Sequence, residues 1–191
     1  MPCEIETGDV NNDGLTDLFV NDSYMTVYLT NPDNLQMTPW NFYEWYRSDY
    51  ISDVKHNSLS VGDLDNNGMI DMIHFYHRFY NATRAIGHVF LNEEGYVMEY
   101  SSSDLPFSAL WNAQVTIGDF DHDYDLDVLY NGNDDDELPA VKLYLNRVTQ
   151  ANNPPETPVN PDAHVTGNTA QLSWDSSSDT QTPPGGLSYN V

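Results

Sequence analysis

The sequence contains little of several things that most chains of its length have. Cys3 is the only cysteine among 191 residues, which excludes an intrachain disulfide and a thiolate metal cluster. Only 6 residues are lysine or arginine, against 30 aspartates and glutamates. The formal net charge of -24 therefore makes binding to the phosphate backbone of nucleic acids unfavourable. Because no run of about eighteen apolar residues occurs, this segment is not expected to insert into a membrane.

The chain also lacks sustained 3.6-residue periodicity with capping residues, so we expect almost no helix. Its first residues, MPCEIETG, have no basic and apolar leader, and they predict no signal peptide within this segment. What the chain does contain is 39% apolar and 13% aromatic residues, enough to form a core rather than a disordered acidic tail.

Three segments repeat one acidic pattern. They read GDVNNDGLTD from Gly8, GDLDNNGMID from Gly62 and GDFDHDYDLD from Gly118, so the period is about 55 residues. A short alternating run precedes each segment and a compact apolar run follows it, which is typical of two strands around a tight polar loop. The predicted strands are residues 4–8, 58–62 and 113–118 before the loops, and 17–20, 71–75 and 127–130 after them.

A further apolar element recurs in each unit, at residues 26–31, 88–92 and 142–146, each ending in asparagine. Each unit thus supplies three or four antiparallel strands. One such sheet cannot bury both of its faces, whereas radial stacking of several sheets can. The predicted fold is all-β, with residues 1–148 forming about three blades of a β-propeller. Because propellers have about four to eight blades, we expect the others upstream; a ring of two or three copies is the alternative.

The composition changes after residue 148. Residues 149–161 are rich in proline and asparagine and predict a linker. Residues 162–191 alternate into a strand near Trp174, pass a Ser/Asp/Pro/Gly loop and enter another predicted strand at Leu187. This pattern resembles the N-terminal part of a fibronectin type III-like domain, truncated well short of the about 100 residues of a β-sandwich of this kind.

The acidic loops have the donor pattern of a calcium site. Ca²⁺ takes six to eight oxygen ligands from carboxylates, amides and backbone carbonyls, and a glycine at the sixth position lets the loop turn around the ion. We therefore predict up to three Ca²⁺ ions. The predicted ligands are Asp9, Asn11, Asp13, the Leu15 carbonyl and Asp17 in loop one; Asp63, Asp65, Asn67, the Met69 carbonyl and Asp71 in loop two; and Asp119, Asp121, Asp123, the Asp125 carbonyl and Asp127 in loop three.

Two other interpretations of the loops were weighed. An EF-hand needs a glutamate at position 12 and flanking helices, but position 12 is Val20, His74 or Tyr130 and the predicted flanks are strands. A hairpin that uses aspartate and asparagine only to cap its own backbone, without metal, stays open.

Taken together, the loops and their flanking strands resemble the FG-GAP repeat family, also called VCBS-type repeats, over about residues 3–148. The resemblance implies blades of a seven-bladed, integrin α-like propeller in which calcium braces the structure. Loops one and two match the family pattern throughout. Loop three has Tyr124 where the pattern has glycine, so its calcium binding is expected to differ.

Outside the loops, the aromatic Trp40, Trp45 and Tyr46 suggest packing between blades or a sugar-stacking platform. The acidic run 134–137 is expected to be a solvated turn, and His122 to face solvent. No catalytic residues and no organic cofactor are predicted.

The functional hypothesis is a non-catalytic, calcium-stabilised propeller segment of a secreted or cell-surface multidomain protein. It would act in adhesion or in binding an extracellular protein or glycan ligand. The alternative is the propeller or accessory part of a secreted polysaccharide-degrading enzyme, which requires a catalytic set that is not visible in this sequence.

Overall fold

The computed structural model describes residues 4–21, 25–40, 57–77, 85–93, 97–101, 110–134, 136–149, 153–182, 184–187 and 189. Within these ranges the fold is all-β, and the helical content is a single short 3₁₀ turn, η2 (Pro184–Gly186). The strands are β1 (Glu4–Gly8), β2 (Asp17–Asn21), β3 (Met25–Thr30), β4 (Met37–Trp40), β5 (Asn57–Gly62), β6 (Asp71–His77), β7 (Ala85–Glu93), β8 (Val97–Ser101), β9 (Trp111–Gly118), β10 (Asp127–Asn133), β11 (Pro139–Tyr144), β12 (Asp162–Thr166) and β13 (Thr169–Ser173). The predicted strands up to residue 146 are therefore confirmed, with small shifts at their ends.

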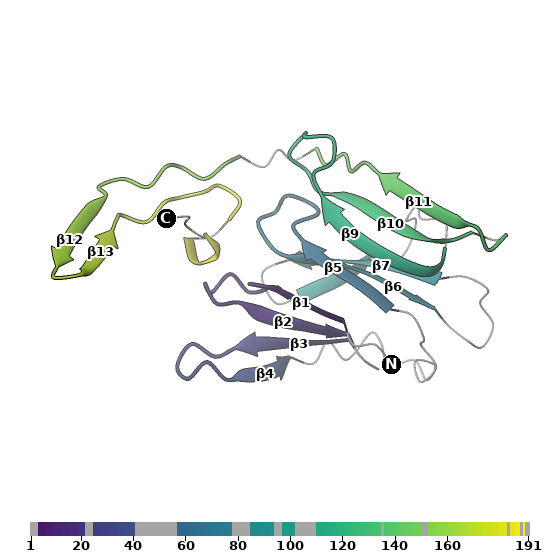
Figure 1. Ribbon diagram of the computed structural model, residues 1–191, viewed down its shortest axis with the longest axis horizontal. Coiled ribbons are helices and arrows are strands. Elements are labelled where there is room, and N and C mark those ends of the chain that lie inside the picture. The colour runs from purple at the N-terminus through teal and green to yellow at the C-terminus, as the bar shows by residue number, and fades with distance from the viewer. Residues whose placement is uncertain are drawn as a thin grey trace.

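The strands form three consecutive antiparallel sheets and one separate hairpin. The first sheet has the order β1-β2-β3-β4, the second β5-β6-β7-β8 and the third β11-β10-β9, while β12 pairs only with β13. Figure 1 shows the three sheets side by side in chain order, with their acidic loops at the same end. Among the described residues the sheets do not close into a ring.

Two apolar clusters hold neighbouring sheets face to face. Burial of one large apolar side chain contributes about 1.5–3 kcal/mol, so each cluster is a major source of stability. The cluster between the first and second sheets consists of Val10, Phe19, Val27, Leu59, Met72 and Phe90. The cluster between the second and third sheets consists of Leu64, Ile73, Phe75, Val89, Leu110, Ala113, Val115, Val128 and Tyr130.

Glycines at the start of the loops permit this close approach of the sheets. A Cβ added to Gly8 would lie 2.4 Å from Cδ1 of Ile70, which belongs to the second sheet's loop. A Cβ added to Gly62 would lie 2.8 Å from Cδ1 of Leu126 in the third sheet's loop. The glycines that begin the first two motifs therefore make room for an aliphatic side chain of the next sheet.

An asparagine adds a hydrogen bond across each sheet boundary. Asn92 Nδ2 in the second sheet donates to the Val10 carbonyl of loop one at 2.8 Å. Asn146 Nδ2, just after the third sheet's last strand, donates to the Leu64 carbonyl of loop two at 2.7 Å. The two contacts occupy equivalent positions, and we call each an asparagine lock.

The first sheet departs from this arrangement, and the sequence alignment of the repeats needs a correction. In the sequence, Asn31 occupies the repeat position that corresponds to Asn92 and Asn146. The structural equivalent is Thr30, because its backbone N–H donates to the closing aspartate of its own loop, as those of Asn92 and Asn146 do. The Thr30 hydroxyl donates to the Thr16 carbonyl within the first sheet, so its hydrogen bond stays inside that sheet.

We call the face that each sheet turns toward the next one its forward face. On the first two sheets this face is covered, and Val10 and Leu64 are 1% and 8% exposed. On the third sheet the equivalent residue, Phe120, is 43% exposed, and Leu143 on β11 is 48% exposed. The third sheet thus presents an uncovered forward face, on which Phe120 and Leu143 are the exposed counterparts of the buried Leu64 and Val89.

Residues 153–161 form no regular secondary structure. The hairpin β12–β13 follows, with all of its residues exposed. Leu187 and Tyr189, the described residues of the last predicted strand, are not in a strand. None of the helical structure in the described residues has the length and apolarity needed to cross a membrane.

Candidate metal sites in the three acidic loops

Each acidic loop connects two neighbouring strands of one sheet, between β1 and β2, β5 and β6, or β9 and β10. Strands flank all three loops, which rules out the EF-hand interpretation. The sixth position has positive φ in every loop, 87° at Gly14, 86° at Gly68 and 73° at Tyr124. The fourth position also has positive φ, at Asn12, Asn66 and His122. The sequence pattern explained the sixth position but not the fourth.

The closing aspartate is the buried centre of each loop. Asp17, Asp71 and Asp127 are each 0% exposed. One oxygen of Asp71 accepts a hydrogen bond from the Leu64 N–H, and the other accepts one from the Asn92 N–H, both at 2.7 Å. Asp17 and Asp127 bond the equivalent N–H groups. This aspartate therefore joins the loop to the sheet's third strand as well as facing the ligand set.

The first aspartate shapes the turn. Asp63 accepts hydrogen bonds from the N–H groups of Asn67 and Gly68, at 3.0 and 2.9 Å. Asp9 and Asp119 make the same pair of bonds in their loops. These contacts are what a metal-free capping turn would use, so they are compatible with both interpretations of the loops.

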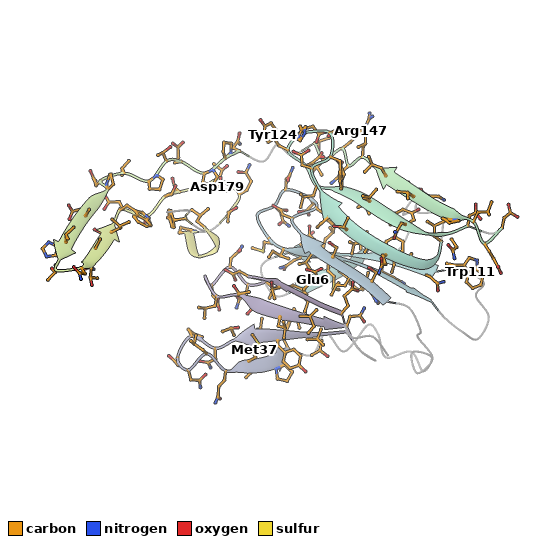
Figure 2. All side chains as sticks on the ribbon, in the orientation of Figure 1. Glu6, Met37, Trp111, Tyr124, Arg147 and Asp179 are labelled. Carbon is orange, nitrogen blue, oxygen red and sulfur yellow. The ribbon has the colours of Figure 1, made fainter. Side chains whose placement is uncertain are left out.

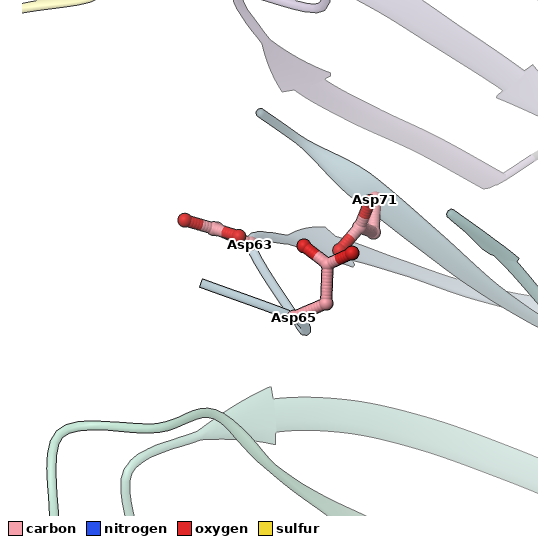
Figure 3. A group of neighbouring side chains, drawn as sticks. All are labelled: Asp63, Asp65 and Asp71. Carbon is pink, nitrogen blue, oxygen red and sulfur yellow. The ribbon is translucent and has the colours of Figure 1, made fainter. Parts of the chain in front are cut away.

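Carboxylates converge in two of the three loops. In loop two, ligand atoms of Asp63, Asp65 and Asp71 lie within 4.8 Å of one another, as the close-up in Figure 3 illustrates. In loop three, Asp119, Asp121 and Asp127 form the same group. Backbone capping does not require three like charges at this distance, whereas a divalent cation could be coordinated by them. Both groups of aspartates can hold a metal ion.

Loop one has the same backbone arrangement with one amide. Asn11 replaces the third-position aspartate, and its Nδ2 donates to Asp13 Oδ2 at 3.0 Å. The predicted ligands Asp9, Asn11, Asp13 and Asp17 lie on this single turn. Loop one thus has three carboxylates and one amide where loop three has four carboxylates among the side-chain ligands.

Burial makes the metal-free loops electrostatically costly. Desolvation, with smaller contributions from the neighbouring Asp65 and Asp63 charges, raises the pKa of Asp71 to about 7 even though the hydrogen bonds from its backbone partners act to lower it. Burial likewise raises the pKa values of Asp63 and Asp17. Lys142 and Arg147 are the only lysine or arginine within the described ranges, and neither belongs to a loop. A bound cation would stabilise the ionised carboxylates and lower these pKa values.

The fifth and seventh positions interact with each other. Oδ1 of Asp13 accepts from the Leu15 N–H at 2.9 Å, and Asn67 and Asp123 bond Met69 and Asp125 in the same way. The fifth-position carboxylate of loop three, Asp123, is not part of that loop's group of three converging carboxylates.

Asp125 has a side-chain role that the sequence analysis missed. The loop spacing predicted only its carbonyl as a ligand, by analogy with Leu15 and Met69. The side chain is buried, and Oδ2 accepts from the Val148 N–H at 3.0 Å. Its other oxygen, Oδ1, is buried and meets no hydrogen-bond donor among the described residues. An acidic residue at a position that is aliphatic in the other two loops is the signal that could have identified it.

The remaining predictions have mixed outcomes. Trp40 packs against the cluster between the first two sheets, in agreement with the packing interpretation. Trp45 and Tyr46 lie outside the described residues. His122 is exposed, as expected. Asp134, in the predicted solvated turn, caps it by accepting from the N–H groups of Asp136 and Leu138.

A buried polar cluster in the sheets was not predicted. His74 and His88 are directly opposite each other on β6 and β7, and both are buried. His74 Nε2 lies 3.1 Å from Asn21 Nδ2 of the first sheet. Burial lowers the pKa of His74 to about 3, and the nearby His88 adds to this effect. The contact between His74 and Asn21 therefore joins the first and second sheets.

Comparison of the sequence with known proteins finds no matching family model and no significantly similar curated protein.

Proposed function

We propose that the three loops bind Ca²⁺ and that the ions stabilise the packed sheets. The converging buried carboxylates of loops two and three carry this proposal. Oxygen-only donors favour hard cations, and the mixture of carboxylates, amides and carbonyls suits the flexible coordination of Ca²⁺ better than the strict octahedron of Mg²⁺. The residues that would hold the ions are the predicted ligands, with the side chain of Asp125 added in loop three.

The three sheets are, on this proposal, consecutive blades of an FG-GAP-type propeller. The uncovered forward face of the third sheet supports it. Gly118, which lacks an aliphatic neighbour from another sheet, and the Phe120 carbonyl are the counterparts of Gly62 and the Leu64 carbonyl. This face therefore fits a further sheet with an aliphatic residue before its closing aspartate and an asparagine at its lock position.

The propeller segment would serve a secreted or cell-surface protein as a non-catalytic scaffold that binds a protein or glycan ligand. The proposed calcium loops support this location. Extracellular calcium is abundant enough to fill sites of modest affinity, with dissociation constants of about 10⁻⁴–10⁻³ M for extracellular modules. Calcium would fix the loops at one end of the sheets, and the partner would bind a surface that this rigid scaffold presents.

The test measures calcium binding by isothermal titration calorimetry and the melting temperature with and without chelator. We expect up to three sites and a large loss of melting temperature on chelation. Asp65→Asn should weaken or remove one site, because it removes a carboxylate from the loop-two group. Asp162→Asn, on the exposed strand β12, is the matched control and should leave binding unchanged. No heat of binding at millimolar calcium, together with a melt that chelation leaves unmoved, would refute the proposal.

A further inference from the structure

A short segment near the C-terminus lies against loops one and two. We call residues 181, 182 and 184–186 the strap. A Cβ added to Gly185 would lie 2.3 Å from the carbonyl oxygen of Asn12. A Cβ added to Gly186 would lie 2.5 Å from Oδ1 of the same asparagine. The strap backbone thus approaches the backbone of loop one so closely at Gly185 that a larger residue would collide with it, and at Gly186 it contacts the Asn12 side chain. Figure 1 shows η2 beside the loop that joins β1 and β2.

The strap reaches loop two as well. A Cβ added to Gly68 would lie 2.0 Å from the Gln181 carbonyl oxygen and 2.8 Å from the Thr182 nitrogen. The equivalent glycine of loop one, Gly14, would place its Cβ 3.0 Å from the Gly185 carbonyl oxygen. The sixth-position glycines therefore have two roles, because they allow positive φ and also provide a bare surface for the strap.

Loops one and two present this surface together. Asn12 Nδ2 donates to the Gly68 carbonyl at 3.0 Å, which joins the outer sides of the two loops. Loop three has His122 and Tyr124 at the equivalent positions, and Tyr124 is 78% exposed. Figure 2 shows the Tyr124 side chain at the loop between β9 and β10. A backbone segment could not approach loop three in the same way.

The strap is attached to the rest of the C-terminal segment. Asp179 accepts hydrogen bonds from the N–H groups of Thr180 and Thr182, which shape the turn that leads into the strap. Beyond it, the ring of Tyr189 lies 5.4 Å from that of Trp174, and its hydroxyl accepts from the Ser177 N–H. Docking of the strap on the loops therefore sets the position of the whole C-terminal segment that follows the sheets.

We propose that loops one and two form the docking surface for the strap, so that calcium in these loops sets the position of the C-terminal segment relative to the sheets. This inference rests on the proposed calcium binding. Ligand positions one, three, five and nine face the ion, whereas the fourth and sixth positions form the outer side of the same turn. An ion that holds the turn in one conformation also holds the strap's docking surface. By thermodynamic linkage, a docked strap raises the calcium affinity by the same factor as bound calcium strengthens docking of the strap.

The test compares Gly185→Asn with Gly167→Asn in the full chain. Gly185 lies against Asn12, whereas Gly167 is in the β12–β13 turn with no atom near its added Cβ, and its φ of 62° suits asparagine. Small-angle scattering measures the radius of gyration in calcium, and calorimetry measures affinity. For Gly185→Asn we expect a larger radius of gyration and about fivefold weaker binding at two of the sites. Gly167→Asn should match the wild type.

The outcomes separate the two proposals. Absence of calcium binding by the wild type refutes the proposed function and removes the basis of the strap. Normal calcium binding, with the same radius and affinity in all three proteins, refutes the strap alone. Circular dichroism melts check that the sheets remain folded. Gly186→Asn, which would contact the Asn12 side chain, provides a second variant that should behave like Gly185→Asn if that one folds poorly.

Discussion

Tyr124 is the residue whose type does not suit the backbone conformation of its position in the repeat. Its φ of 73° is the conformation that the glycines of the other two loops adopt without a steric cost. An L-residue in this region costs about 1–2 kcal/mol, and the exposed Tyr124 ring gains little packing to offset this cost. Loop three thus keeps the shape of the other loops at the expense of local strain.

Tyr124→Gly is expected to stabilise the protein by up to about 1 kcal/mol, less the extra chain entropy that glycine gives the unfolded state. Urea unfolding in the presence of chelator measures this change without the contribution of calcium. Tyr124→Ala removes the same ring but keeps the steric cost of positive φ, so it should produce no such gain. Equal effects of the two substitutions would show that the strain is not at this residue.

His74 links stability to pH through its burial. Its pKa in the folded protein is about 3, below its ordinary value of 6.5, so between these values the unfolded chain binds the proton and the folded protein does not. The free energy of unfolding therefore falls as the pH drops below about 6.5, by at most about 1.4 kcal/mol per pH unit.

His74→Gln should remove this dependence. Between pH 7 and pH 5.5 the wild type is expected to lose about 1 kcal/mol more stability than the variant, measured by denaturant unfolding in saturating calcium. The exposed His164 on β12 provides the control, and His164→Gln should keep the wild-type slope. Parallel pH profiles for wild type and His74→Gln would contradict the assignment.

At the scale of elements, the asparagine locks explain how sheets that share no strand are held in register. Each lock satisfies a loop carbonyl that belongs to the neighbouring sheet, and Val10, which provides one of these carbonyls, is fully buried. A buried acceptor left without a donor costs about 1–3 kcal/mol. The locks therefore complement the apolar clusters, which are less directional.

Asn92→Ala is expected to destabilise the protein by about 1–3 kcal/mol, because the Val10 carbonyl loses its side-chain donor. Asn146→Ala should have a similar or smaller effect, since Asn146 is less buried. Chemical denaturation of each variant gives these values. Asn168→Ala, in the exposed turn of the β12–β13 hairpin, should change stability by less than about 0.5 kcal/mol. If the free energy of unfolding falls no more in the lock variants than in this control, the locks do not contribute to stability.

At the scale of the molecule, the forward face of the third sheet leaves a cluster of apolar side chains in water. Leu143, Val141 and Phe120 are exposed on it, although Val89 and Leu64, the second-sheet equivalents of Leu143 and Phe120, are buried. Apolar surface of this kind drives association when no further sheet covers it. The repeat thus leaves the third sheet with a partly apolar face that no other described sheet covers.

Leu143→Lys should reduce association of this chain. Sedimentation velocity over a range of concentrations, in calcium and about 0.15 M salt to screen the net charge, is expected to show self-association of the wild type. The lysine places a charge in the apolar face and should shift the protein toward monomer. Val165→Lys, at an exposed site on β12, is the control. A monomeric wild type at all concentrations would show that the face is tolerated in water.

The periodicity of the acidic motif was sufficient to predict the strands around each loop and the all-β class, because alternation and turn chemistry are local properties. Most of the predicted ligand positions follow from the same local spacing. The roles of Gly8 and Gly62 could not be obtained in this way, because the atoms that require them, on Ile70 and Leu126, belong to the next sheet. For the same reason the sequence did not show that Thr30, and not Asn31, is the structural equivalent of Asn92 and Asn146. Only the hydrogen bond to the loop aspartate identifies the equivalent residue.

By itself the sequence determined which residues turn, which extend and which carboxylates converge in loops two and three, because these depend on φ preferences and on spacing within about ten residues. Only the tertiary structure decided how the units meet. The asparagine locks, the His74–His88 pair, the buried Asp125 oxygen and the strap against Asn12 and Gly68 join residues far apart in the chain. Such contacts depend on how closely folded surfaces approach, and no local pattern records that distance.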